Sequence, residues 1–158
     1  MQAPHPITID AYQPTDLDAV IAIFQAAIRE VASRDYTAAQ VDAWAQVDRE
    51  RWAAARSSRP TWIARTGITA IGFADLEPDG HLDMMFVHPA HQSVGVASAL
   101  LNAVEASARA QNLSRLFTEA SITARPFFEK RGFLVTAAQT VEKRGQHLRN
   151  YRMTKSLE

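Results

Sequence analysis

The sequence predicts an α/β domain in which about seven strands alternate with four helices. Its 158 residues are 47% apolar, which is enough for the hydrophobic core of one domain. Some stretches repeat apolar residues with the helical period, and others are short runs of bulky residues bounded by turn signals. At the centre, a strand at residues 82–87 leads through a glycine-bearing loop into a helix. These three observations predict the fold class, with elements in the order β-α-α-β-β-β-α-β-α-β-β.

The N-terminal third is expected to form one strand and two helices. Residues 7–12 read as a strand, and apolar residues spaced at the helical period predict an amphipathic helix over 17–31. Thr15 with Asp18 three residues later is typical of a capping box at the start of that helix. A second start signal at Thr37 and Gln40 predicts another helix, which continues to about residue 55.

The middle of the chain reads as a set of neighbouring strands. Residues 61–65 and 70–76 are expected to be strands joined at Gly67. A Pro-Asp-Gly turn at residues 78–80 then leads into the central strand, 81–87.

The C-terminal half begins with the helix that follows the central loop. Its apolar positions fall at i, i+3, i+4, i+7 and i+11 from Ala97. A strand is expected over 114–119, and Thr123 is placed to cap a short helix over 124–131. A closing hairpin turns at Arg144-Gly145.

Composition excludes several classes of protein. Equal numbers of basic and acidic residues give zero net charge, which argues against a general affinity for nucleic acid or anionic membranes. The absence of cysteine excludes disulfides and cysteine-based zinc sites or nucleophiles, and it fits a reducing cytosol. No signal peptide or membrane span is visible. We therefore expect a cytoplasmic protein with a single domain over residues 1–158.

The central loop is suited to an anion. A helix that starts at such a loop presents several free backbone N–H groups at one point. The helix dipole adds roughly half a positive charge there, so a phosphate or pyrophosphate is a fitting ligand, although an ordinary strand–loop–helix connection would look the same.

Two motifs resemble those of the GNAT superfamily of acyl-CoA-dependent N-acyltransferases. Gln92-x-x-Gly95-x-Ala97, after the central strand, resembles the acyl-CoA pyrophosphate motif of that family. The segment from Ser121 to Phe133, with Phe-Glu-Lys-x-Gly-Phe as its core, resembles a second family motif. The predicted element order also matches the GNAT fold, a mixed central β-sheet flanked by helices.

The resemblance implies transfer of an acetyl group from acetyl-CoA, as cosubstrate, to an amine. The expected partners are acetyl-CoA and an amine acceptor, without nucleic acid, membrane or metal. The five histidines show no metal-ligand spacing. The acceptor and the oligomeric state, including a homodimer, stay open.

The resemblance also assigns cofactor contacts. Backbone groups of the central strand would pair with the pantetheine arm, the loop and first helical turn would hold the diphosphate, and the second motif would pack the arm. The positions are Phe86, Val87, Ser93, Val94, Gly95, Val96, Ala97, Ser98, Ser121, Phe127, Phe128 and Lys130. Ser93 could equally be only a helix cap. Ser121 stands where relatives often have an asparagine.

The proton donor for the leaving thiolate is where the sequence departs from the family. Relatives commonly have tyrosine at the position of Phe128, and phenylalanine has no ionisable proton. Either Tyr151 or a water supplies the proton, or the thiolate leaves without one.

The general base is expected on the central strand. Alternation places His81, Asp83, Met85 and Val87 on one face. Asp83 is the first candidate, directly or through water, and His81 is the second because its ordinary pKa of about 6.5 suits the task. Both could instead be structural, with Asp83 hydrogen-bonded in the sheet and His81 at a hairpin end. Weaker candidates are Asp75, Glu77 and Glu119.

Substrate choice in this family usually depends on the first two helices and the last hairpin. These segments offer Arg29, Arg34, Tyr36, Trp44, Trp52 and Tyr151. An alternative to an enzyme is an acyl-CoA-binding or sensing domain that has lost catalysis. A mononucleotide-binding domain is disfavoured, because the phosphate-loop lysine and the fuller glycine fingerprint are absent.

Overall fold

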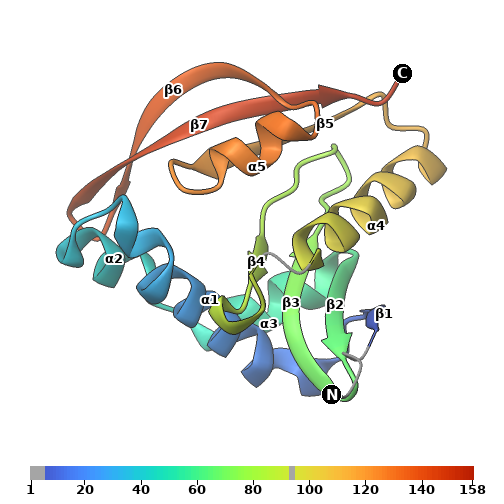
Figure 1. The fold of residues 1–158 in the computed structure, drawn as a ribbon, viewed down its shortest axis with the longest axis horizontal. Coiled ribbons are helices and arrows are strands. Elements are labelled where there is room, and N and C mark those ends of the chain that lie inside the picture. Colours follow the sequence, from blue (N-terminus) through green and yellow to red (C-terminus); the bar gives the residue numbers. More distant parts are fainter. Residues whose placement is uncertain (1–5, 93–94) are drawn as a thin grey trace, which may run out of the picture.

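The computed structural model describes residues 6–92 and 95–158, and within them strands and helices alternate much as predicted (Figure 1). The elements are β1 (Ile7–Ala11), α1 (Leu17–Glu30), α2 (Ala38–Trp44), α3 (Arg49–Ser58), β2 (Thr61–Thr66), β3 (Thr69–Asp75), β4 (Met85–Val87), α4 (Val96–Ala110), β5 (Arg115–Ser121), α5 (Arg125–Lys130), β6 (Leu134–Lys143) and β7 (Gln146–Ser156).

The strands form two antiparallel sheets that meet at one point. The first has the order β1-β2-β3-β4 and the second the order β5-β7-β6. A parallel bridge between His81 and Phe117 joins them, and Leu82 N donates to Phe117 O at 2.9 Å. Beyond this bridge β4 and β5 part, since they belong to different sheets. Figure 1 shows the β6–β7 hairpin arching over α5, with one end of the hairpin reaching down to α2.

The central strand is shorter than predicted. The prediction of a strand over residues 81–87 is wrong for its first half, because β4 begins only at Met85. The buried carboxylate of Asp75 explains this: Oδ1 accepts hydrogen bonds from Asp83 N at 3.1 Å and Met84 N at 2.8 Å. A side chain thus takes backbone donors that a regular strand would use in its ladder.

The stretch that was predicted to form one helix, from Thr37 to about residue 55, forms the two helices α2 and α3. The capping box at Thr37 and Gln40 is confirmed, with Thr37 N donating to Gln40 Oε1 at 2.8 Å and Gln40 N to Thr37 Oγ1 at 3.2 Å. The helix stops at Trp44, and α3 begins after Asp48, whose carboxylate accepts from Arg51 N at 3.2 Å.

The start of α1 also differs from the prediction. Thr15 and Asp18 do not form its cap; instead Gln13 N donates to the carboxylate of Asp16 at 2.9 Å. A short 3-10 turn over Pro14–Asp16 therefore precedes the helix.

The core has two parts. Apolar residues of α4, such as Leu100 and Val104, pack with Ile71 and Leu116 in one cluster. Apolar residues of α1 to α3 pack in a second cluster, to which β3 contributes Phe73. The two clusters hold the helices around the first sheet, so that the open edge of β4 faces the second sheet. Within residues 6–92 and 95–158, no helix is long and apolar enough to cross a membrane.

Candidate active site

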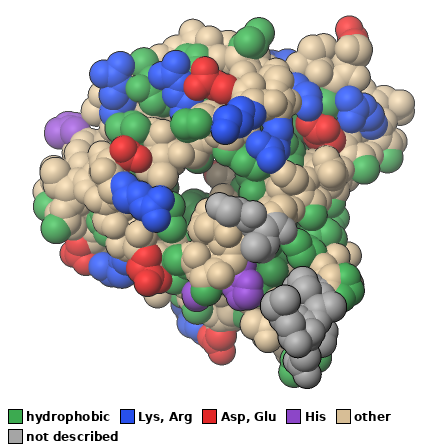
Figure 2. Space-filling view, in the orientation of Figure 1, with side chains coloured by type: hydrophobic (Ala, Val, Ile, Leu, Met, Phe, Trp, Pro, Cys, Tyr) green, Lys and Arg blue, Asp and Glu red, His purple; other side chains and the backbone are tan. Residues whose placement is uncertain are grey.

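A first cavity of about 280 Å³, the α5 cavity, lies where β4 and β5 part. It is enclosed by α1, β4, the start of α4 and α5. Figure 2 shows this face of the molecule hollowed at its centre, between the part with α5 and the β6–β7 hairpin and the part with α1 and β4. The lining includes Ile28, Arg34, Trp44, Met85, Phe86, Val87, Gln92, Ala97, Ser121, Thr123, Phe127 and Phe128.

A second cavity of about 220 Å³, the hairpin cavity, lies between the charged loop before β4 and the β6–β7 hairpin. Its lining is more polar and comprises Tyr36, Trp44, Asp83, Met84, Glu119, Ser121, Gln139, Val141, Lys143, Leu148, Arg149 and Asn150. Trp44 and Ser121 line both cavities, so the two adjoin.

The loop at the start of α4 has the predicted geometry for a helix that begins at glycine. Gly95 is the N-cap, with φ of 85° in the left-handed region that glycine adopts easily. A Cβ at Gly95 would meet no described atom within 4 Å, so this side of the loop is open. The side chain of Gln92 donates to Val87 O at 3.0 Å and ties the loop to β4. The residues predicted to hold the diphosphate, from Ser93 to Ser98, are called the cradle below. Two of them, Ser93 and Val94, lie outside the described residues.

The other predicted cradle residues serve different purposes. Val96 is buried in the core, whereas Ala97 lines the α5 cavity. Ser98 Oγ accepts a hydrogen bond from Arg131, a residue that our sequence analysis did not select. The guanidinium of Arg131 also lies 3.8 Å from the ring centroid of Phe127. A fixed cation therefore sits beside the first turn of α4.

The second motif supplies aromatic rings to the α5 cavity. Phe127 and Phe128 line it together with Phe86 and Val87, so the structure brings these predicted residues together. Phe128 is buried and meets the rings of Phe127 and Phe133 edge to face. Its role is packing.

Lys130 is not brought to this site. Its side chain is exposed and lines neither cavity. In the same motif Arg131, one residue later, holds the position beside α4. Lys130 and Arg131, at the end of the predicted short helix, indicated that a cation lies here. The sequence alone did not show that Arg131 is the one that contacts α4.

Ser121 lies at the junction of the two cavities and starts the turn into α5. Its Oγ accepts from Ala124 N at 3.0 Å. The predicted cap at Thr123 is wrong, because Thr123 Oγ1 contacts Asp35 at 2.7 Å instead. Since Ser121 accepts from the backbone, its hydroxyl hydrogen remains able to donate to a ligand.

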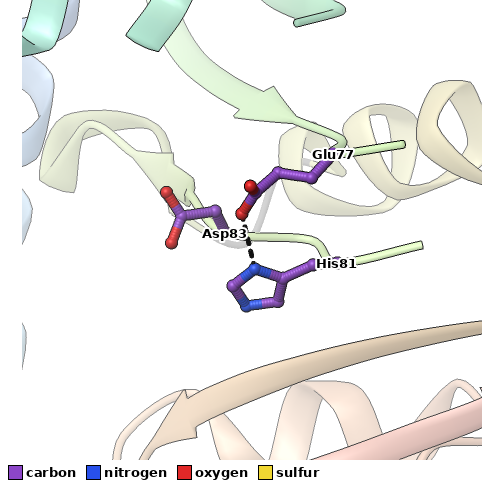
Figure 3. Close-up of side chains that lie close together, drawn as sticks. All are labelled: Glu77, His81 and Asp83. Carbon is purple, nitrogen blue, oxygen red and sulfur yellow. Dashed lines mark hydrogen bonds and ion pairs between the residues drawn. The ribbon is translucent and has the colours of Figure 1, made fainter. Parts of the chain in front are cut away.

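His81 is held between two carboxylates. Nδ1 lies 2.6 Å from Glu77 Oε1, drawn as the dashed line in Figure 3, and Nε2 lies 2.7 Å from Glu119 Oε2. The ring also stacks on Phe117. Burial favours the neutral ring, but the hydrogen bond to Glu77 and the charge of Glu119 outweigh it and raise the pKa of His81 above 6.5. With both nitrogens donating, the imidazolium has no lone pair with which to accept a proton.

Asp83 lies close to Glu77 and His81, and its side chain is 35% exposed. Its Oδ2 is 3.2 Å from Arg59 and 3.8 Å from the buried Arg56. Arg59 also contacts Asp75 and Glu77, each at 3.4 Å. We call this set the charge cluster; it comprises Asp75, Glu77, Asp83, Glu119, Arg56, Arg59 and His81.

Three members of the charge cluster are close enough to share a metal ion, since the ligand atoms of Glu77, His81 and Asp83 lie within 4.8 Å of one another. A ligating histidine must be neutral with one nitrogen free. Here both nitrogens face carboxylates, and Arg59 already occupies Glu77 and Asp83. The donor set therefore fits a hydrogen-bonded ion cluster better than a metal centre.

The two tyrosines considered from the sequence have different positions. Tyr36 lines the hairpin cavity, but its hydroxyl donates to Arg149 O at 2.5 Å and accepts from Ile122 N at 3.0 Å. Burial also raises the pKa of Tyr36. Tyr151 lines neither cavity; its ring lies between the guanidinium groups of Arg125 and Arg149. The hydroxyl of Tyr36 is thus occupied by backbone partners, whereas Tyr151 as the proton donor stays a prediction.

Comparison with known proteins agrees with this geometry. Residues 32–157 match the family model described as an acetyltransferase (GNAT) domain. The N-acetyltransferase YafP of Escherichia coli (strain K12) is 40% identical over 147 residues, covering 93% of this chain and 94% of that protein.

Solved structures give the same result. A GCN5-related N-acetyltransferase from Rhodopseudomonas palustris superposes with a TM-score of 0.93 at 36% identity, over 99% of both chains. The YncA acetyltransferase of Salmonella typhimurium, solved with acetyl-CoA, shares the fold with a TM-score of 0.74 at 21% identity, over 97% of this chain and 95% of that one. The chain therefore belongs to the GNAT family and is an acetyl-CoA-dependent N-acetyltransferase.

Proposed function

We propose that the protein transfers the acetyl group of acetyl-CoA to an amine of a small molecule or peptide by direct attack within a ternary complex. The observation that carries this proposal is the junction of the two cavities at Trp44 and Ser121. Acetyl-CoA in the α5 cavity would present its thioester at the junction, and an amine in the hairpin cavity would approach from the charged side.

The cofactor is bound by backbone groups and one cation. The N–H groups at the start of α4 and the helix dipole favour the diphosphate, and Arg131 adds positive charge beside them. The backbone groups of Phe86 face β3, where Phe86 pairs with Phe73, so the predicted backbone contact of Phe86 with the pantetheine arm is wrong. The free edge of β4 at Met85 and Val87 hydrogen-bonds the amides of the arm, as an added strand would. Phe127 and Phe128 pack against the arm. Ser93 and Val94 remain predicted members of the cradle.

The amine must lose a proton before it attacks. A lysine-like amine has a pKa of about 10.4 and arrives charged near neutrality. Asp83 is the group we assign to accept this proton, directly or through one water, because it lines the hairpin cavity and is partly open to solvent. Glu119 lines the same cavity and is the second candidate. His81 acts as a positioning residue that fixes Glu119 and Glu77.

The neutral amine then attacks the thioester carbonyl, the carbon–sulfur bond breaks to release the CoA thiolate, and the new amide nitrogen loses its surplus proton to water. Phe128 offers no proton, and Tyr151 lies outside both cavities. A thiol of this type has a pKa of about 8.5, so the thiolate is a tolerable leaving group without a general acid. The free hydroxyl hydrogen of Ser121 is placed at the junction to donate a hydrogen bond to the reacting group.

The proposal is tested by measuring acetyl-CoA binding calorimetrically and then CoA release with a panel of primary amines. We expect acetyl-CoA to bind and at least one class of amine to drive CoA release above the rate of hydrolysis. Binding without release for any amine would contradict the enzyme and favour an acyl-CoA-binding domain. Absence of binding would overturn the cofactor site.

A further inference from the structure

Trp44 is a large side chain at the boundary between the two cavities. Of the described residues, Trp44 and Ser121 alone line both. The indole ring of Trp44 meets the ring of Tyr36 edge to face, with 5.5 Å between the ring centroids, and the ring of Phe86 at 6.4 Å. Tyr36 lines the hairpin cavity and Phe86 lines the α5 cavity. The side chain of Trp44, and not only its backbone, therefore lies where the cavities adjoin.

Helix α2 holds Trp44 in place, because hydrogen bonds tie this helix to the β6–β7 hairpin. Gln40 Nε2 donates to His147 O at 2.8 Å, and Arg144 Nη1 donates to Ala43 O at 3.0 Å. Trp44 is the last residue of α2, and its ring packs against the second core cluster. We therefore expect the indole ring to keep its position when a ligand binds beside it.

The acyl group of the donor has to fit at this boundary. In the proposed ternary complex the thioester lies where the cavities adjoin, since the amine reaches it from the hairpin cavity. Trp44, on α2, and Ser121, on β5, then bound the acyl group on two sides. Because serine is small, the larger steric limit comes from the indole ring.

Met84 is the other large apolar side chain close to this position, since it lines the hairpin cavity just before β4. A methionine side chain rotates about three bonds and refits to a neighbouring group, whereas an indole ring is one rigid plane. An acyl chain that grows toward Trp44 therefore meets a wall that does not yield. A chain that turns away from Trp44 enters the hairpin cavity, which the amine needs.

We propose that Trp44 determines which acyl group is transferred: the indole ring leaves room for acetyl and excludes longer chains such as butyryl. This inference rests on the proposed acetyl transfer at the same site. Trp44 takes no part in moving protons, so its replacement changes the choice of donor and leaves the chemical steps as they are.

A series of donors tests the inference: acetyl-CoA, propionyl-CoA and butyryl-CoA, each assayed by CoA release with the amine that reacts best with acetyl-CoA. We expect kcat/KM of the wild type to fall by about 10-fold or more for each added methylene, since one methylene in a fitted pocket is worth roughly 10–200-fold. Equal use of acetyl-CoA and butyryl-CoA would overturn the role of Trp44 while leaving acyl transfer intact.

Replacing Trp44 should relax this preference. Trp44→Ala should raise the ratio of kcat/KM for butyryl-CoA to that for acetyl-CoA by about 10-fold or more. Trp44→Phe keeps a ring beside Tyr36 and Phe86, should raise the ratio by less, and takes the place of Trp44→Ala if that variant does not fold.

The matched control is Trp62→Ala, because Trp62 is half-buried on β2 and lines neither cavity. Its ratio should equal that of the wild type. An unchanged ratio in the Trp44 variants, the same rise in the control, or a larger rise in Met84→Ala would contradict the role of Trp44.

Binding of the same donors without an amine, measured by calorimetry, separates this inference from the proposed function. The wild type should bind butyryl-CoA more weakly than acetyl-CoA, whereas Trp44→Ala should bind the two with similar affinity. That result, without CoA release for any amine, would keep the limit set by Trp44 and count against the proposed function itself. If no amine drives CoA release, equal affinity of the wild type for both donors would overturn the inference as well.

Discussion

His81 and Glu119 join the two sheets: the Nε2 atom of His81 lies 2.7 Å from Glu119 Oε2 across 38 residues of sequence. The contact lies beside the bridge between His81 and Phe117, just before β4 and β5 part. It therefore fixes the place where the α5 cavity and the hairpin cavity begin. The geometry of the site therefore depends on the contact between His81 and Glu119, and so on the protonation state of His81.

The stabilising effect of His81 should depend on pH. Because the pKa of folded His81 is raised above 6.5, its charge stabilises the fold fully below pH 6.5 and the effect is lost as the pH rises through the folded pKa. His81→Gln should therefore lower the free energy of unfolding by about 2 kcal/mol at pH 5.5 and by less above pH 8. Urea unfolding of both proteins across this range measures the difference.

The control for this experiment is His147→Gln, since the side chain of His147 is exposed and forms no ion pair within the described ranges. Its effect on unfolding should be small at every pH. A His81→Gln effect that stays constant from pH 5.5 to 9 would contradict a protonated His81 between Glu77 and Glu119.

Gly95 should matter for acetyl-CoA more than for stability. Alanine at φ of 85° costs about 1 kcal/mol, and relief of that strain would move the N–H groups at the start of α4. Gly95→Ala should weaken acetyl-CoA binding by about 10-fold in calorimetry, because the diphosphate depends on these groups.

Gly145 provides a matched comparison. It has φ of 81°, and a Cβ there would also meet nothing within 4 Å, but it lies in the β6–β7 turn. Gly145→Ala should cost similar stability and leave acetyl-CoA affinity unchanged. If both variants bound acetyl-CoA as tightly as the wild type, the cradle would have to be placed elsewhere.

Tyr151 should be dispensable for the chemistry. Its ring packs between Arg125 and Arg149 and lines neither cavity. Tyr151→Phe keeps the ring and should leave kcat within about twofold across the alkaline limb of the pH profile, since no proton is lost from the site. A fall of 10-fold or more, growing at high pH, would restore Tyr151 as the acid.

Local signals in the sequence predicted much of the fold. The capping box at Thr37 and Gln40 involves residues three apart, so its hydrogen bonds are encoded locally and the prediction was right. The glycine at the start of α4 was readable for the same reason. The length of β4 was not, because the carboxylate that ends its ladder belongs to Asp75, on the preceding strand.

The site was predictable only in part. The aromatic pair at Phe127 and Phe128 and the strand at Phe86 and Val87 were expected together, and the structure places them in one cavity. The partners of His81 were not predictable from spacing, because Glu119 lies on another sheet. That pairing places a carboxylate at each ring nitrogen of the candidate base. Such tertiary contacts bear on the proton chemistry, and the motifs do not encode them.

The proposed role of Asp83 is tested most directly by the turnover of Asp83→Asn, measured as CoA release at saturating acetyl-CoA, with Asp42→Asn as a control outside the cavities. We expect kcat to fall by about 100-fold with acetyl-CoA affinity unchanged, since a general base contributes 10²-fold or more. Asp42 pairs with Arg29 on the surface, so its variant should turn over normally. Wild-type turnover in Asp83→Asn, with an unchanged pH profile, would contradict the assignment of the charged side of the hairpin cavity as the place where the amine loses its proton.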